Sequence, residues 1–155
     1  MKIFYLRIFT LVTIFAVLGC PHIVANASSS DSLWLTNFET ALKIAKETKK
    51  PILLDFTGSD WCGWCIRLKK EVFSENSFKS FAKQNLVLVE VDFPRKNNQD
   101  PFLRKQNDKL SKKYEIRGFP TIVLLDFNGN FIDKTGYVKG GPIRYISHLK
   151  ELLKQ

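Results

Sequence analysis

The chain has 155 residues, of which 45% are apolar and 25% are charged. This is the composition of an ordinary globular protein, and the length allows one domain whose hydrophobic core needs no cysteines to hold it together. The formal net charge is +9. A basic surface is compatible with nucleic acid, an anionic membrane or acidic proteins, but these lysines are scattered along amphipathic helices, so we interpret them as a solvated face.

The N-terminal stretch has the pattern of an export signal. Two basic residues precede residues 8–19, an almost uninterrupted apolar run that is too short for a comfortable membrane span. The A-x-A sequence at residues 25–27 suits ordinary signal cleavage. We therefore predict a signal peptide at residues 1–27, a folded domain at residues 28–155 and a periplasmic location, in which nucleic acid is not a partner.

A lipoprotein signal is the alternative to this cleavage. The sequence at residues 17–20 resembles such a signal, which would span residues 1–19 and leave Cys20 as a lipidated N-terminus attached to a membrane. Leu18 is not the small residue usually found at its position, so we favour cleavage after Ala27. An uncleaved anchor is a third alternative, and in none of the three do we expect Cys20 to be a catalytic thiol.

The remaining cysteines are expected to react rather than to stabilise the fold. Cleavage after Ala27 leaves 128 of the 155 residues and, because it removes two of the 24 basic residues and none of the 15 acidic ones, a net charge of +7. Cys62 and Cys65 are then the only cysteines, and a disulfide between them closes almost no loop. For this reason an inert local disulfide, or a pair of buried apolar thiols, is a weaker alternative. A metal site is also weaker, because a second pair of metal ligands is missing.

The first half of the domain predicts alternating helices and strands. A capping box at residues 36–39 opens a helix that stops before Pro51. Residues 52–56 form an apolar run that is typical of a strand buried on both faces at the centre of a sheet. A helix follows from about Cys62, and a short second amphipathic piece covers residues 78–83. The expected buried face of the first of these helices consists of Cys65, Leu68 and Val72.

The second half predicts a parallel strand and then a hairpin. Residues 86–92 form a second buried strand that a right-handed crossover makes parallel to the first. Asp100 and Pro101 open a helix, and the strands at 122–126 and 131–134 are joined by an Asn-Gly turn. The closing helix has an expected inner face of Ile143, Ile146, Leu149 and Leu153. We predict an α/β fold with a central mixed sheet and helices on both of its faces.

Two motifs resemble those of the thioredoxin superfamily. Residues 61–65 read Trp-Cys-Gly-Trp-Cys after the first long strand, and residues 118–121 read Gly-Phe-Pro-Thr before the hairpin. The resemblance covers residues 34–153 and is strongest to the small exported thiol-disulfide oxidoreductases. It implies a thioredoxin-like domain at residues 28–155, a redox-active disulfide between Cys62 and Cys65, and no cofactor or metal.

The resemblance also implies roles for individual residues. Cys62 corresponds to the nucleophile at the helix start, where unpaired backbone amides and the helix dipole favour the thiolate, and Cys65 corresponds to the resolving cysteine. Pro120 matches the family's cis-proline beside the cysteines. Asp55 lies near the place of a buried acid that assists proton transfer, but the segment from Asp55 to Cys62 is one residue longer than in thioredoxin, so Glu90 is a substitute candidate.

Aromatic residues flank the cysteine pair and the proline. Trp61 and Trp64 cover the disulfide or contact an extended substrate, and for each ring simple packing is the alternative. Phe119 and Thr121 extend the same surface.

The length of the mature chain indicates whether the protein reduces, oxidises or isomerises disulfides. Exported oxidases of the family carry a large helical insertion and isomerases carry a dimerisation domain, and 128 residues leave room for neither. We therefore predict a monomeric protein-disulfide reductase that keeps exported protein cysteines reduced and is recharged by a membrane electron donor of the DsbD type.

Several other functions are weaker alternatives. An oxidase, an isomerase and a reductant for cytochrome maturation use the same exchange chemistry. A Cys-His hydrolase would need His148, which we expect at the surface of the closing helix. A chaperone or binding module without redox chemistry, or a metal carrier, would use the fold alone.

Overall fold

The computed structural model describes residues 32–154, so the predicted signal peptide, both processing sites and Cys20 lie outside the described residues. Within that range no helix is long and apolar enough to cross a bilayer. The elements follow one another in the order β1 (Trp34–Leu35), α1 (Phe38–Thr48), β2 (Ile52–Thr57), α2 (Gly63–Leu68), the π-helical turn η1 (Lys69–Phe73), α3 (Asn76–Asn85), β3 (Val87–Asp92), α4 (Pro101–Lys113), β4 (Thr121–Leu125), β5 (Phe131–Thr135) and α5 (Gly141–Leu152).

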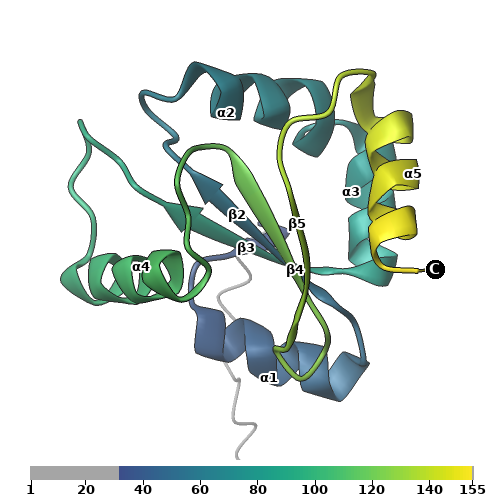
Figure 1. Ribbon diagram of the computed structural model, residues 1–155, viewed down its shortest axis with the longest axis horizontal. Helices are drawn as coiled ribbons and strands as arrows, with labels where there is room; N and C mark the ends of the chain where they lie inside the picture. Colours follow the sequence, from purple (N-terminus) through teal and green to yellow (C-terminus); the bar gives the residue numbers. More distant parts are fainter. Residues whose placement is uncertain (1–31, 155) are drawn as a thin grey trace, which may run out of the picture. The chain divides into compact units, whose positions relative to one another are not determined.

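The five strands form one mixed sheet in the order β1-β3-β2-β4-β5. The central strand β2 pairs in parallel with β3 and antiparallel with β4, and β5 completes a hairpin with β4. Every residue of β2 is buried, as its apolar run predicts for a strand covered on both faces. The expected central mixed sheet is confirmed, and Figure 1 shows helices on both of its faces.

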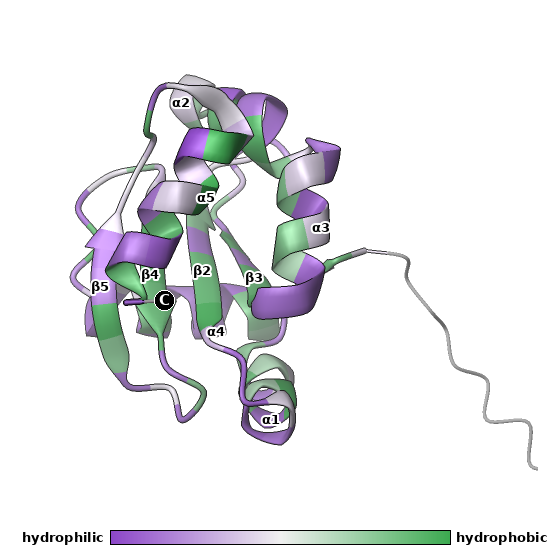
Figure 2. Ribbon diagram, turned by 90° about the vertical axis from the view of Figure 1, so that its right-hand side faces the viewer, coloured by the Kyte–Doolittle hydropathy of each residue, from purple (hydrophilic) through white to green (hydrophobic). Residues whose placement is uncertain are grey.

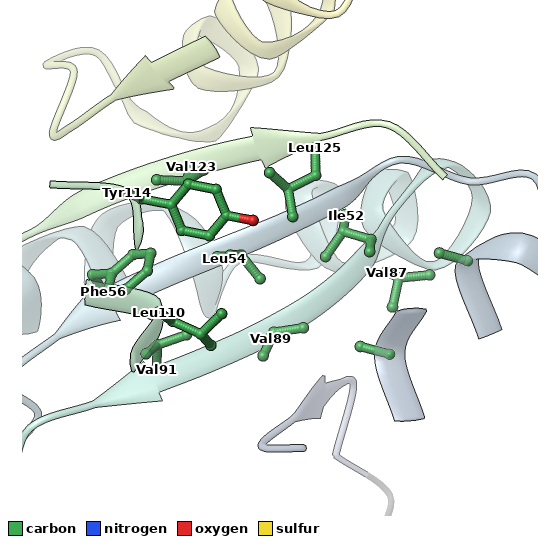
Figure 3. Close-up of a cluster of buried hydrophobic side chains, with 12 residues drawn as sticks. Ile52, Leu54, Phe56, Val87, Val89, Val91, Leu110, Tyr114, Val123 and Leu125 are labelled. Carbon is green, nitrogen blue, oxygen red and sulfur yellow. The ribbon is translucent and has the colours of Figure 1, made fainter. Parts of the chain in front are cut away.

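One face of the sheet packs against α1 and α4. Alternate residues of β2, β3 and β4 meet Ala41 and Ala45 of α1 and Leu110 of α4, and Tyr114 closes the cluster (Figure 3). Hydrophilic residues gather on the outward surfaces of the helices (Figure 2). The helix α4 begins as predicted, because the Asp100 carboxylate accepts hydrogen bonds from the first-turn amides and Pro101 follows it.

The opposite face packs against α2, η1, α3 and α5. Leu68 and Val72 are buried there as predicted, and Phe78 of α3 joins them. The expected inner face of α5 is partly wrong, because Ile143 is 67% exposed whereas Tyr145 is fully buried. The Tyr145 ring stacks edge-on against Phe73 and its hydroxyl donates to the Gly136 carbonyl, so an aromatic residue with a satisfied polar tip takes the inner position.

Two further features differ from the sequence expectation. The N-cap of α1 is Asn37 rather than Thr36, because the Asn37 side chain accepts the Thr40 N–H at 2.8 Å. The Phe38 N–H, which the helix itself leaves unpaired, donates to the Gln106 side chain of α4. Strand β1 was not predicted, because a two-residue edge strand beside a polar leader carries no periodic signal.

Candidate active site

The loop between β2 and α2 fixes the position of Cys62. The Gly58 carbonyl accepts hydrogen bonds from the backbone amides of both Trp61 and Cys62, at 3.2 and 2.8 Å. A Cβ atom at Gly58 would lie 2.5 Å from the Trp61 ring, so only glycine allows this close approach. Cys62 has an extended backbone and forms the N-cap of α2.

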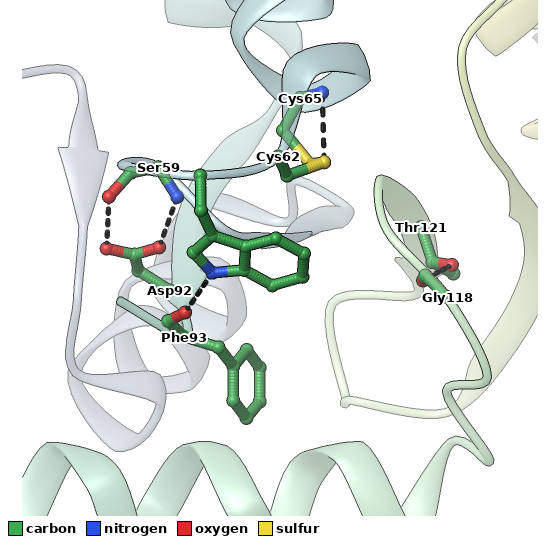
Figure 4. Close-up of a disulfide and its surroundings, with 8 residues drawn as sticks. Ser59, Cys62, Cys65, Asp92, Phe93, Gly118 and Thr121 are labelled. Atoms are coloured by element: carbon green, nitrogen blue, oxygen red, sulfur yellow. Dashed lines mark hydrogen bonds between the residues drawn. A yellow bond between two sulfur atoms is a disulfide. The ribbon is translucent and has the colours of Figure 1, made fainter. Parts of the chain in front are cut away.

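Cys62 and Cys65 form a disulfide in the structure (Figure 4). The Cys65 N–H donates to the Cys62 Sγ at 3.2 Å, so an amide of the first helical turn points at this sulfur. The two cysteines are 7% and 4% exposed. When the disulfide is reduced, the same amide and the helix dipole stabilise a thiolate on Cys62 more than one on Cys65.

Trp61 belongs to a wall beside the disulfide. Its indole N–H donates to the Phe93 carbonyl at 2.8 Å (Figure 4), and its ring lies edge-on to Phe119 with centroids 5.8 Å apart. The guanidinium carbon of Arg95 lies 3.6 Å from the centroid of the Trp61 ring. Simple packing, the alternative for this ring, therefore accounts for most of its contacts, and Phe119 shares the wall.

Two carboxylates that the sequence analysis did not single out hold this wall in place. Asp60 accepts hydrogen bonds from the backbone amides of residues 95–97, and these bonds keep the pKa of Asp60 below its usual value. Asp92 at the end of β3 accepts both the amide and the hydroxyl of Ser59 (Figure 4). Neither contact has a local sequence signal, because each joins segments more than thirty residues apart.

The proline loop, residues 118–121, carries the Phe119 ring of this wall. The Phe119–Pro120 peptide bond is cis, as the motif predicted. The Thr121 hydroxyl donates to the Gly118 carbonyl at 2.7 Å and closes the loop just before β4 (Figure 4). Because Phe119 contacts Trp61, which directly precedes Cys62, the structure brings the two predicted motifs together.

Trp64 is the exposed aromatic residue of the pair. It is 56% exposed, and the centroids of the Trp64 and Tyr137 rings are 5.3 Å apart. The Tyr137 hydroxyl donates to Glu71, and Glu71 also pairs with Arg67 at 2.8 Å. The hydrogen bond with Tyr137 lowers the pKa of Glu71 and raises the pKa of Tyr137. Tyr137 lies in a loop without a motif, so the sequence carries no signal for its role.

Asp55 lies buried on the sheet face that α2 covers. Its Oδ1 atom has no hydrogen-bond partner among residues 32–154. Burial, and to a smaller extent the negative charge of Glu90, raises the pKa of Asp55 from 3.8 to about 8, although the Lys69 ammonium opposes this shift. Asp55 is therefore mostly protonated at neutral pH.

His148 belongs to a different neighbourhood. Its Nε2 atom lies 2.8 Å from the Thr135 hydroxyl, and its ring lies edge-on to Tyr145. Among the contacts described for residues 32–154, His148 pairs with Thr135 and Tyr145 and makes no contact with Cys62. The Cys-His hydrolase alternative therefore gains no geometric support.

The fold and the dithiol at a helix start define a thiol-disulfide oxidoreductase. The thioredoxin-like domain family matches residues 38–150, and the chain belongs to this family. The chain is 42% identical over 118 residues to the disulfide bond reductase DsbH of Chlamydia pneumoniae. The aligned region covers 76% of this chain and 71% of that protein.

Solved structures agree with this assignment. The structure of a DsbH oxidoreductase has a TM-score of 0.74 and 41% identity, over 78% of this chain and 83% of its own. A thioredoxin from Thermus thermophilus has a TM-score of 0.58 at 15% identity, over 77% of this chain and 85% of its own, and shows the fold alone. The recognised resemblance and the thioredoxin-like fold class are confirmed.

Proposed function

We propose that the chain is a protein-disulfide reductase that keeps the cysteines of exported proteins reduced. The observation that carries this proposal is the Cys62–Cys65 pair at the start of α2, with the Cys65 amide directed at the Cys62 sulfur. The similarity to a protein named as a disulfide bond reductase supports the reducing direction. The geometry supports the exchange chemistry, which is the same in both directions.

The reaction begins with the reduced pair. The Cys62 thiolate attacks one sulfur of a substrate disulfide, a bond forms between Cys62 and the substrate, and the other substrate sulfur leaves as a thiolate that takes a proton from water. No histidine is needed for this step, because the helix start stabilises the attacking thiolate.

Cys65 completes the reaction. In the fraction of molecules in which Asp55 is ionised, the Cys65 thiol gives its proton to the Asp55 carboxylate, and the resulting thiolate attacks the Cys62 sulfur. The Cys62–Cys65 disulfide forms, and the bond between Cys62 and the substrate breaks, so the substrate is released reduced and the enzyme is left oxidised. Asp55 is suited to this task because it is buried on the face that α2 covers and its pKa is raised to about 8.

The substrate is an extended segment of a protein. Pro120 and Thr121 form one side of its binding surface, and Trp64 offers an exposed ring on the other. Trp61 and Phe119 form the wall beneath, where their rings are in edge-on contact.

The proposal includes a location and a source of electrons. The N-terminal export pattern supports a periplasmic location, with lipidation of Cys20 as the alternative anchor. The protein acts as a monomer, because its length leaves no room for a dimerisation domain. After each turnover the disulfide must be reduced again, and a membrane electron donor of the DsbD type supplies the two electrons.

Reduction of insulin disulfides tests the proposal. The wild-type protein should catalyse the reaction with dithiothreitol as the electron source, and Cys62→Ser should abolish it. Cys65→Ser should still attack and should accumulate mixed disulfides, which non-reducing electrophoresis detects. His148→Ala is the matched control and should keep wild-type activity. A Cys62→Ser protein that reduces insulin normally would refute the proposed chemistry.

A further inference from the structure

Two carboxyl side chains lie side by side beneath the active-site helix. Asp55 of β2 pairs in register with Glu90 of β3 in the parallel part of the sheet. Neighbouring strands are about 4.8 Å apart, and paired residues of parallel strands point to the same face of the sheet. Asp55 is buried, whereas the Glu90 side chain is 27% exposed. The pair therefore joins a buried position to a position that solvent reaches.

A hollow lies between Glu90, the exposed member of this pair, and the resolving cysteine. The hollow has a volume of about 320 Å³, and Cys65, Glu90 and Lys69 are among the residues that line it. The Lys69 ammonium lies 3.3 Å from the Glu90 Oε1 atom. Glu90 is thus fixed at a solvent-accessible site that also borders Cys65, and Lys69 is the cation nearest to it.

The surroundings favour the protonated form of Asp55. Two neighbouring carboxylates repel each other, and burial penalises the ionised form of Asp55. Asp92 adds a further negative charge on the same side of β3, although Ser59 donates two hydrogen bonds to it. From α5 the Tyr145 hydroxyl faces Asp55 as a neutral group, and it donates to the Gly136 carbonyl instead. Among the residues described, Lys69 alone contributes positive charge to Asp55.

We propose that Glu90 and Lys69 set the proton affinity of Asp55, with Asp55 and Glu90 acting as one carboxyl pair and Lys69 as its counter-ion. This inference rests on the proposed function and adds two positioning residues, Glu90 and Lys69, to it. When the pair releases its proton to solvent through the hollow, Asp55 can accept the proton of the Cys65 thiol. Cys65 then attacks Cys62 and the substrate leaves as a thiolate, so one proton moves and two electrons pass to the substrate.

The test compares substitutions that act in opposite directions. Glu90→Gln removes the repelling charge and Lys69→Gln removes the counter-ion, while Lys79→Gln, an exposed lysine of α3, is the matched control. The infrared band of the protonated Asp55 carboxyl is titrated in the full-length oxidised protein, and Asp55→Asn identifies that band. The pH dependence of substrate release in a single turnover is measured on the same reduced variants.

The expected midpoints move apart. The band midpoint should fall by about one pH unit in Glu90→Gln and rise by about one pH unit in Lys69→Gln, because a single charge at this separation shifts a buried carboxyl by that order. The release step should move in the same directions, and Lys79→Gln should match the wild type. Equal midpoints in all variants, or shifts of one sign, would overturn the pair. If the two variants show these band shifts but the wild type reduces no disulfide, the result would support the pair and contradict the proposed function.

Discussion

The substitution Asp55→Asn should make the oxidised protein more stable at neutral pH. The buried carboxyl has a pKa of about 8 in the folded state, and its value in an unfolded chain is close to 3.8. Between these two pH values the folded state binds more protons than the unfolded state, so the stability of the wild type decreases as pH rises. An amide of the same shape has no proton to lose and removes this dependence.

The size of the effect follows from the interval that is crossed. From 3.8 to pH 7 there are about three pH units, and each is worth about 1.4 kcal/mol, so the ceiling is about 4 kcal/mol. The effect should be small near pH 4, where the carboxyl is protonated in the folded state and about half protonated in the unfolded state. It should reach its plateau above pH 8.

Urea unfolding of the oxidised wild type and of Asp55→Asn at a series of pH values from 4 to 9 measures this directly. The difference between the two proteins isolates Asp55 from the other titrating groups. We expect the free energy of unfolding of the variant to increase steadily relative to that of the wild type as pH rises from 4 to 8. The measured quantity is the free energy of unfolding of the variant minus that of the wild type. If this difference does not change with pH, or decreases from pH 4 to pH 7, the assignment of a neutral buried carboxyl is refuted.

Two further substitutions test single contacts. Asn37→Ala should lower the free energy of unfolding by about 1 kcal/mol in urea denaturation, because it removes the N-cap of α1, whereas Thr36→Ala should have little effect; equal losses would contradict the assignment of the cap. Tyr137→Phe keeps the ring beside Trp64 but removes the hydrogen bond to Glu71, so the pKa of Glu71 should rise toward its usual value in an NMR titration of the carboxyl carbon. An unchanged Glu71 titration would show that the hydroxyl does not donate to it.

The sheet and the cysteine pair were predictable because their signals are local. The apolar run of β2 identifies the central strand, Asp100 and Pro101 identify the start of α4, and the spacing of Cys62 and Cys65 places both in one helical turn. Each signal needs only a few neighbouring residues. For this reason the mixed sheet could be predicted without knowledge of the tertiary contacts.

The parts that could not be predicted depend on contacts between distant segments. Gln106 satisfies the Phe38 amide from 68 positions away, and Tyr137 bonds to Glu71 across 66 positions. The predicted inner face of α5 is wrong at Ile143, because helical spacing alone permits more than one apolar face. The packing of α5 against η1 and α3 decides which face is buried, and the sequence of α5 alone does not contain that information.

The reduction potential of the Cys62–Cys65 disulfide tests the proposed direction of exchange most directly. Equilibration of the protein with glutathione buffers of known ratio, followed by quenching and alkylation, gives the fraction in each redox state. We expect a potential close to that of thioredoxin, about −270 mV, which suits a reductase. A potential close to that of DsbA, about −120 mV, would mean that the protein oxidises its substrates and would contradict the reductase function.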